Sequence, residues 1–201
     1  MIISVASVEL SATSVRSAAI AASARRAMVA DAAAIADLVN QAYRAEAFFV
    51  DGNRTSAAEI CELLAEGEFL VIDGPRGLAG SIFVDAYGAT ATAAASPSDV
   101  AVTSDVGRSA VKHAKISMVS VDPEMQRVGI GRRLVAIAEA LSSALGCDAV
   151  TLDVVSARED LLRWYRGLGY REIGAAPYLH RPTKMPCHFV LFEKLLPVSD
   201  N

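Results

Sequence analysis

Apolar residues recur along the chain with two different periods, which separates the expected helices from the expected strands. Ile35, Leu38, Val39 and Ala42 follow one another at i, i+3, i+4 and i+7. This spacing puts four apolar side chains on one face of a helix, which we expect over residues 31–43.

Three further helices follow from similar signals. Apolar residues from Ile130 to Leu145 step by four, three, four and four positions, which predicts a long amphipathic helix ending at Gly146. The motifs Ser56-Ala-Ala-Glu59 and Ser156-Ala-Arg-Glu159 match the capping box and predict the starts of two shorter helices. Apolar or alternating runs predict strands at residues 24–29, 69–73, 78–84, 115–121, 149–155, 170–173 and 188–195.

The order of these elements, β-α-α-β-β-β-α-β-α-β-β, predicts an α/β fold with a central mixed β-sheet. Residues 74–77 form a short turn between two strands, which indicates an antiparallel hairpin. The strand–helix–strand step around Gly129 implies a right-handed parallel crossover. Helices are then expected on both faces of the sheet.

Composition narrows the class of protein. The 201 residues are 53% hydrophobic and carry a net charge of -4, which suits a globular domain and argues against a nucleic-acid surface. Cys61, Cys147 and Cys187 lie far apart, so reduced thiols and a cytoplasmic location are expected. No apolar run reaches the roughly 18 residues that would suggest a membrane span.

We predict one domain over residues 24–195, followed by a tail over residues 196–201. Residues 1–23 are rich in Ala, Ser and Val and lack the basic start of a secretory signal, so a flexible extension is favoured over a targeting segment. Residues 87–112 show little periodicity and are expected to form a surface insertion.

The stretch Val119–Leu134 combines a strand end, a proline-marked turn, a glycine loop and a helix start. Gln126, Gly129 and Gly131 have the spacing Gln-x-x-Gly-x-Gly. Glycine lets a phosphate approach the main chain closely, and the first N–H groups of a helix have no intrahelical partner. The helix dipole and three nearby arginines add positive charge. The stretch therefore predicts an anion-binding loop.

This stretch resembles the coenzyme-binding loop of the GNAT superfamily of acyl-CoA-dependent N-acetyltransferases. The resemblance rests on Val-Asp-Pro-Glu, then Gln-Arg-x-Gly-x-Gly-x-x-Leu, then a second strand and an aromatic-rich helix, and it covers residues 24–195. It implies the GNAT fold, acetyl-CoA as co-substrate and no metal. In this superfamily the loop N–H groups bind the pyrophosphate of coenzyme A. The preceding strand is bulged, splays from its parallel neighbour and pairs with the pantetheine arm. The implied coenzyme-binding residues are Val119, Ser120, Val121, Gln126, Arg127, Val128, Gly129, Ile130, Gly131 and Arg132.

Tyr165 is the residue for which the resemblance implies a catalytic role. The run from Trp164 to Tyr170 is similar to the superfamily's aromatic-Tyr-x-x-x-Gly-aromatic signature, in which the tyrosine lies near the coenzyme sulfur. A phenol there can protonate the leaving thiolate or hydrogen-bond to it. One position departs from the pattern, because Arg158 stands where many members carry asparagine.

No general base is evident in the sequence. The strand around Lys115, where the superfamily often has a carboxylate, contains none. Deprotonation of the amine through water is therefore the default expectation, with Asp85 and Asp153 as weaker alternatives. His180, Cys187 and His188 match no recognised metal-site spacing, so structural roles are favoured.

The acceptor is expected to bind near the loop between the first two helices, which borders the acceptor groove in this superfamily. Phe48, Phe49, Asp51 and Arg54 could bind an acceptor with an apolar portion and a carboxylate, or the two phenylalanines could only anchor the loop. The net charge of -4 leans towards a cationic acceptor.

We therefore predict an N-acetyltransferase that moves an acetyl group from acetyl-CoA to a primary amine by direct transfer in a ternary complex. The acceptor is a small-molecule or peptide amine, with neither nucleic acid nor membrane as a partner, and a homodimer is left open. The alternative is a non-catalytic acyl-CoA-binding regulatory module. A phosphate-loop NTPase is disfavoured, because Arg132-Arg133 stands where Lys-Ser/Thr would follow the glycines.

Overall fold

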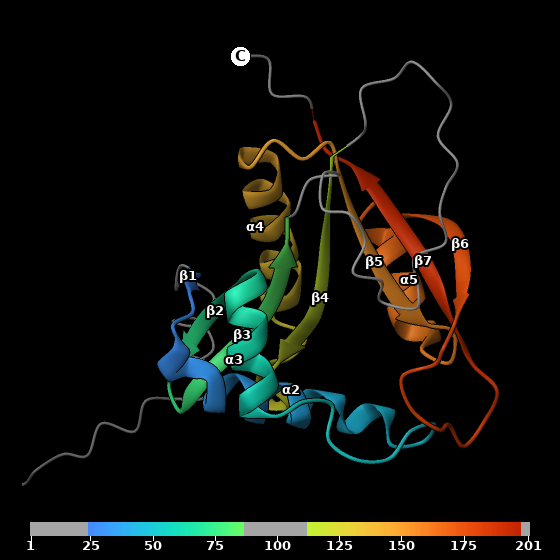
Figure 1. The fold of residues 1–201 in the computed structure, drawn as a ribbon, viewed down its shortest axis with the longest axis horizontal. Helices are drawn as coiled ribbons and strands as arrows, with labels where there is room; N and C mark the ends of the chain where they lie inside the picture. Colours follow the sequence, from blue (N-terminus) through green and yellow to red (C-terminus); the bar gives the residue numbers. More distant parts are fainter. Residues whose placement is uncertain (1–23, 87–111, 198–201) are drawn as a thin grey trace, which may run out of the picture.

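A computed structural model describes residues 24–86 and 112–197 of the chain (Figure 1). The strands are β1 Arg25–Arg26, β2 Glu68–Gly74, β3 Gly77–Asp85, β4 His113–Val121, β5 Ala149–Val155, β6 Arg171–Pro177 and β7 His188–Leu195. The helices are α2 Ala32–Tyr43, α3 Ala57–Glu66, α4 Ile130–Ala144 and α5 Glu159–Gly167, with short 3-10 turns at Val29–Asp31, Arg44–Glu46 and Pro123–Met125. The strands form one mixed sheet in the order β1-β2-β3-β4-β5-β7-β6.

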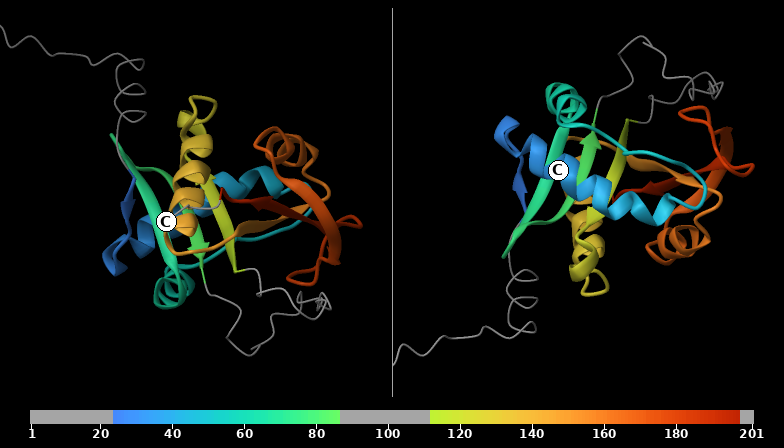
Figure 2. Two further views of the ribbon diagram at one scale, coloured as in Figure 1. Left: turned by 90° about the horizontal axis from the view of Figure 1, so that it is seen from above. Right: turned by 90° about the horizontal axis from the view of Figure 1, so that it is seen from below.

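Alternating side chains of β2 and β3 separate the two sides of the sheet. Leu70 and Ile82 point into a core shared with α4 and α5. Phe69, Val71 and Phe83 point the other way, into a core shared with α2 and α3. Figure 2 shows α4 and α3 on opposite sides of these strands. The predicted mixed sheet with helices on both faces is confirmed.

The sheet opens between its two halves. β4 and β5 pair in parallel only over His113–Lys115 and residues 149–151, whereas β5 pairs with β7 along its whole length. Figure 1 shows β4 and β5 diverging beyond this short ladder, with α2 running past their separated ends. The main-chain groups of β4 beyond Lys115 therefore form no β-ladder with β5.

A bulge in β4 accompanies this divergence. Ser81 of β3 pairs with Ser120, but Phe83 pairs with Ser117, so two β4 residues lie opposite Ile82. Met118 has a φ of 50°, in the left-handed region. A bulge bends its strand and increases the local twist. The bulge and splay implied by the resemblance are thus present in the structure.

Most predicted elements are confirmed, including the capping box of α3. The Ser56 side chain accepts a hydrogen bond from Glu59 N, and the Glu59 carboxylate accepts one from Ser56 N. The second predicted capping box is wrong, because α5 begins after Arg158 and the Ser156 hydroxyl instead accepts a hydrogen bond from His188 N. A tertiary partner on β7 has replaced the local one.

Two strands end more than two residues away from their predicted ends. β1 contains only Arg25–Arg26, because a 3-10 turn begins at Val29. β6 continues to Pro177, four residues past its predicted end, because it pairs with β7 across a register shift. An edge strand accepts Pro at its end without losing a ladder hydrogen bond on the solvent side.

The predicted extension over residues 1–23 and most of the predicted insertion lie outside the described residues, as does the end of the predicted tail. The single domain over residues 24–195 stays a prediction.

Gly80 sets the distance between β3 and α4. A Cβ atom at this position would lie 2.8 Å from Leu134 Cδ1, 2.9 Å from Ile130 Cγ2 and 3.2 Å from the Ser120 carbonyl oxygen. Leu134 and Ile130 are themselves buried, so neither side chain can move aside freely. The absence of a side chain at Gly80 therefore lets α4 pack closely on the sheet.

We expect Gly80→Ala to lower the free energy of unfolding by about 1–3 kcal/mol through overpacking. Gly167→Ala is the matched control, since a Cβ there has nothing within 4 Å. Urea unfolding followed by the fluorescence of Trp164, the single tryptophan of the chain, measures both. Equal stability of the two variants would contradict the close packing at Gly80.

Candidate functional site

The glycine loop ends in a left-handed residue at the start of α4. Gly129 is the N-cap residue, with a φ of 95°, and Arg127 also has a positive φ of 65°. Apart from its chain neighbours, no described residue has an atom within 4 Å of the position a Gly129 Cβ would take, so the described main chain is open to a ligand there. The first N–H groups of α4 and the helix dipole point to this opening. This loop fits an anionic group such as a pyrophosphate.

The end of β4 is held against this loop. The Gln126 side-chain amide donates a hydrogen bond to the Val121 carbonyl oxygen at 3.3 Å. Ser120 and Ile130 are buried, so their side chains face the core. These two residues can therefore offer a ligand only their main-chain groups.

Tyr165 lies next to this region in α5. Its ring packs against Trp164 at 4.7 Å between centroids and against Tyr170 at 5.7 Å. The Trp164 indole in turn lies 3.5 Å from the position of a Cβ on Gly131, which places α5 beside the start of α4. Burial raises the pKa of the Tyr165 phenol, and the nearby Tyr43 phenol adds to this rise. Tyr165 is therefore protonated at neutral pH.

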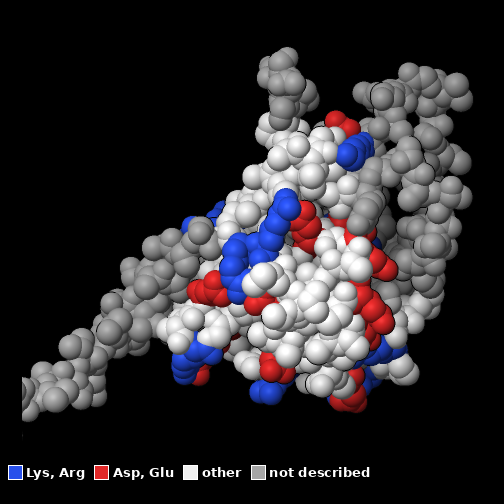
Figure 3. Space-filling view, turned by 60° about the vertical axis from the view of Figure 1, so that its left-hand side comes forward, with Lys and Arg blue, Asp and Glu red and all other residues white. Residues whose placement is uncertain are grey.

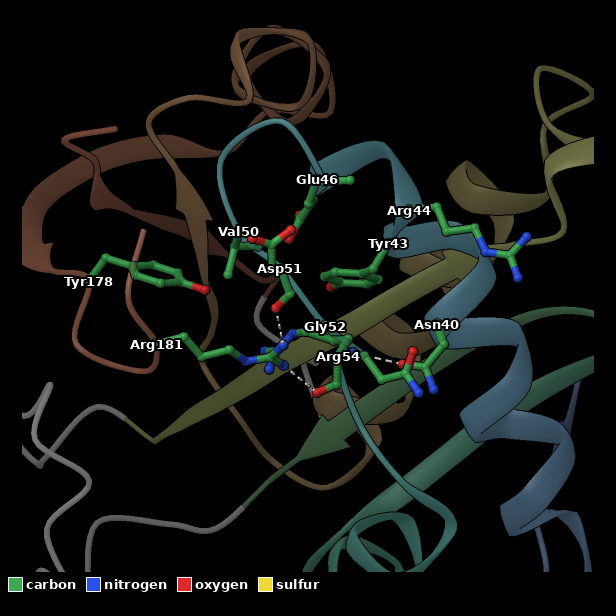
Figure 4. Close-up of a pocket in the computed structure, with 12 residues that line it drawn as sticks. Asn40, Tyr43, Arg44, Glu46, Val50, Asp51, Gly52, Arg54, Tyr178 and Arg181 are labelled. Atoms are coloured by element: carbon green, nitrogen blue, oxygen red, sulfur yellow. Dashed lines mark hydrogen bonds between the residues drawn. The ribbon is translucent and has the colours of Figure 1, made fainter. Parts of the chain in front are cut away.

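A pocket opens on the other side of Tyr43, with a volume of about 100 Å³ (Figure 4). It lies between the segment after α2 and the loop joining β6 to β7. Its lining residues are Asn40, Tyr43, Arg44, Glu46, Ala47, Val50, Asp51, Gly52, Asn53, Arg54, Tyr178 and Arg181. Tyr43 lines the pocket and also contributes to the raised pKa of Tyr165, so one residue is common to the pocket and the surroundings of Tyr165.

Hydrogen bonds fasten the two pocket segments together. Lys184 N donates to the Phe49 carbonyl oxygen at 2.8 Å, and Val50 forms an isolated bridge with Thr183. The Arg181 guanidinium donates to the main-chain oxygen of Arg54 at 2.8 Å, as Figure 4 shows. The pocket is thus built from two segments more than 120 positions apart in the chain.

Glu46 is the buried carboxylate of this pocket, with only 8% of its surface exposed. Burial raises its pKa, although three arginines oppose that rise, namely Arg158, Arg54 and Arg181. The Arg158 guanidinium lies 3.4 Å from Glu46 and 2.9 Å from Asp160. This bridge joins the start of α5 to the turn that follows α2.

Comparison with known proteins identifies the family. A family model for GNAT acetyltransferases matches residues 38–170, more than half of the chain. The chain belongs to the GNAT acetyltransferase family. The family resemblance drawn from the glycine loop is confirmed. A comparison with curated protein sequences found no match.

Solved structures of GNAT acetyltransferases have the same fold. The ribosomal-protein-alanine N-acetyltransferase of Brucella melitensis has a TM-score of 0.64 at 15% identity, covering 87% of this chain and 99% of that chain. The structure of yncA from Salmonella typhimurium with its cofactor acetyl-CoA gives 0.63 at 18% identity, covering 89% and 96%. Naa20 from Chaetomium thermophilum, in complex with a bisubstrate analogue, gives 0.62 at 20% identity, covering 87% and 86%. At these identities the likeness shows the fold alone.

The GNAT fold brings the predicted coenzyme residues into one region. The predicted segment over residues 119–121 ends beside the glycine loop. Tyr165 lies in α5, which packs beside the start of α4 through Trp164. Arg127 and Arg132 are exposed and Val128 is half-buried, so the two arginines can reach solvent-facing phosphates. The coenzyme role of these residues stays a prediction.

The predicted acceptor loop divides into two parts. Asp51 and Arg54 line the pocket. Phe49 is fully buried and packs against Tyr178, so it anchors the loop, whereas Phe48 is 52% exposed. Phe49 therefore anchors the loop, and acceptor binding by Asp51 and Arg54 stays a prediction.

The two weaker base candidates lie outside the pocket lining. Asp153 forms an ion pair with Lys115 at 2.6 Å, and Asp85 lies at the end of β3. His180, which was considered as a metal ligand, packs its ring against Phe189, with 5.3 Å between the ring centroids. The described part of the chain contains no group of three or more His, Cys, Asp or Glu side chains suited to a metal ion. No helix within that part is long and apolar enough to cross a bilayer.

Sequence reasoning missed Glu46, Tyr43, Tyr178 and Arg181 as pocket residues. Glu46 follows α2 directly, and no local pattern marks it as buried. Arg181 lies in the loop between β6 and β7, next to Pro182. Tyr43 and Glu46 directly precede the predicted acceptor loop, which was the available signal. No signal in the sequence links Tyr178 and Arg181 to that loop, because their contact with it depends on the tertiary fold.

The raised pKa of Glu46 has a measurable consequence for stability. A folded-state pKa above the usual 4.5 means that Glu46 stabilises the fold at low pH and loses this contribution as pH rises through the raised value. We expect Glu46→Gln, which carries no charge, to gain stability relative to wild type as pH rises from about 4 to about 8. Denaturant unfolding across that range measures the trend.

Glu59→Gln is a control for which the expected change of stability with pH has the opposite sign. Hydrogen bonds from Thr55 and Ser56 lower the pKa of the exposed Glu59 carboxylate. Its contribution is therefore present at neutral pH and is lost on acidification. The Glu59→Gln variant should lose stability relative to wild type as pH rises. Parallel trends in the two variants would contradict the burial of Glu46.

Proposed function

We propose that this GNAT protein transfers an acetyl group from acetyl-CoA to a primary amine in a ternary complex. The observation that carries this proposal is the opening of the sheet between β4 and β5 beside the glycine loop, with Tyr165 next to it. A strand edge, a helix N-terminus and a buried phenol are thereby directed at one region. The acetyl-CoA bound to yncA and the bisubstrate analogue bound to Naa20 support this choice of substrates by analogy.

The main chain supplies the coenzyme contacts in this proposal. N–H groups of Gln126, Arg127, Val128, Gly129, Ile130, Gly131 and Arg132 hold the pyrophosphate, with the α4 dipole behind them. The pantetheine arm pairs with Val119, Ser120 and Val121 in place of the missing β5 ladder. Peptide-like amides of the arm then satisfy main-chain groups that the splay leaves without a ladder partner.

The chemical step is attack of the neutral amine on the thioester carbonyl carbon. A C–N bond forms, and the carbonyl oxygen becomes an oxyanion held by a main-chain N–H of the β4 bulge. The C–S bond then breaks and the electron pair leaves with the coenzyme sulfur. Tyr165 donates a hydrogen bond to this thiolate. Full proton transfer from Tyr165 is disfavoured, because burial raises its pKa further above that of a thiol.

The amine must lose a proton before or after it attacks. Glu46 is the buried carboxylate of the pocket, and its raised pKa suits a group that accepts a proton. We assign Glu46 this role, directly or through a water molecule. Orientation of the two substrates can lower the barrier by roughly 7–11 kcal/mol at best, so a strong base is not required.

Release of free thiol from acetyl-CoA, measured with a panel of amines, tests the proposed function. Acceptor-dependent release supports an N-acetyltransferase. Tight binding of coenzyme A with no release for any amine would instead favour the non-catalytic acyl-CoA-binding module.

The glycine loop provides a matched pair of variants. Gly129 and Gly146 both have positive φ and open surroundings, at opposite ends of α4. Each Gly→Ala change should cost about 1 kcal/mol of stability through backbone strain. We expect only Gly129→Ala to weaken coenzyme A binding, by about tenfold, measured by calorimetry. Equal loss of affinity in Gly146→Ala would exclude a specific role for the loop.

Tyr165 and Tyr170 provide a second matched pair, since both are buried tyrosines with raised pKa values. We expect Tyr165→Phe to lower kcat by about tenfold or more while the dissociation constant of coenzyme A changes little. Tyr170→Phe should leave kcat close to wild type. Normal turnover by the Tyr165 variant would remove this phenol from the mechanism.

A further inference from the structure

More arginines than acids line the pocket beside Tyr43. Three arginines line it, Arg44, Arg54 and Arg181, against two acids, Glu46 and Asp51. Among the described residues, none of these three arginines forms an ion pair, whereas each acid has a cationic partner outside the lining. Those partners are Arg158 for Glu46, at 3.4 Å, and Lys184 for Asp51, at 2.7 Å.

Arg54 and Arg181 are the two arginines placed to act in this pocket. The Arg54 guanidinium lies over the Tyr43 ring, 5.5 Å from its centroid. The Arg181 guanidinium donates two hydrogen bonds, to the main-chain oxygens of Asp51 and Arg54. A guanidinium has five N–H donors, so Arg181 keeps donors for a ligand. Figure 4 shows that Arg44 points away from the other labelled side chains.

The loop that carries these groups is held in place before any ligand binds. The Asn40 side-chain oxygen accepts hydrogen bonds from Arg54 N at 2.7 Å and Thr55 N at 3.1 Å. Its amide nitrogen donates to the Thr55 oxygen at 2.9 Å. A guanidinium on a fixed main chain loses less entropy when it binds an anion.

Size and closure favour a small ligand. A volume of about 100 Å³ accommodates a compact polar group. The two segments that line the pocket are joined by the Lys184–Phe49 hydrogen bond and the Val50–Thr183 bridge, which hold its walls together.

We propose that the acceptor is a free amino acid and that Arg54 and Arg181 bind its carboxylate while its amine faces Glu46 and Tyr43. This inference rests on the proposed function and names the substrate class for the same site. Arginine binds carboxylates through paired, charge-assisted hydrogen bonds. These two arginines would repel the cationic acceptor that the net charge of -4 suggested. On the face shown in Figure 3, by contrast, acidic and basic side chains lie beside one another.

The test compares each common L-amino acid with its α-amide, which keeps the amine and removes the carboxylate. For the best substrate we expect kcat/KM to favour the acid over the amide by about tenfold or more. Arg54→Gln and Arg181→Gln should reduce this preference to within about threefold, with the KM for acetyl-CoA nearly unchanged. A merely structural defect would lower activity on acid and amide alike and would leave the preference intact.

Two further variants sharpen the comparison. Arg54→Lys keeps the positive charge but loses the paired N–H donors of the guanidinium. We expect it to retain part of the preference for the acid over the amide. Arg166→Gln is the surface control, since Arg166 is exposed in α5 and pairs with Glu172. It should match wild type for every substrate.

Binding measurements separate failure of this inference from failure of the proposed function. If coenzyme A binds but no amine is acetylated, calorimetric titration of acids and amides into the coenzyme-loaded protein still decides the question. Tighter binding of an acid, lost in Arg54→Gln, sustains the inference without turnover. Equal binding of acid and amide, binding of neither, or turnover confined to peptides or a lysine side-chain mimic would overturn it.

Discussion

The short parallel ladder between β4 and β5 is the constraint on which the rest of the site depends. If β4 and β5 paired along their whole length, the main-chain groups proposed to hold the pantetheine arm would be hydrogen-bonded to β5. Pairing instead ends at Lys115, and the β4 bulge at Met118 turns the strand away. The lost ladder hydrogen bonds are offset by packing, because α4 covers one face of β3 and β4 and α2 covers the other. A ligand that supplies the missing partners therefore binds where the fold is already held open.

The Glu46–Arg158 contact connects the two halves of the proposed site. Arg158 belongs to the start of α5, which carries Tyr165, whereas Glu46 belongs to the turn that follows α2. Arg158 replaces the asparagine expected from the superfamily, and its guanidinium reaches across to a buried carboxylate instead. Buried ion pairs add little net stability, but removing one partner is costly. Arg158 thus contributes to the position of the acceptor pocket relative to α5.

Much of the fold could be predicted from local signals, because those signals act within a few residues. The helix at residues 32–43, the Ser56 capping box and the Gly146 helix end were all predicted from spacing and caps, and the structure confirms them. The Ser156 capping box failed because a β7 main-chain group competes for the same hydroxyl. The end of β6 was misplaced because pairing with β7, rather than its own composition, extends it.

The sequence by itself determined the family, the glycine loop and the identity of Tyr165 as a candidate, since these depend on residue type at fixed spacing along one segment. The tertiary structure alone decided the pocket proposed for the acceptor. Arg181 meets the Arg54 main chain across 127 positions, and Glu46 becomes buried only when α5 brings Arg158 to it. Net charge says little about a single pocket, because it sums over the whole surface. A pocket's charge depends on which ion pairs form around it, and only the folded chain sets those distances.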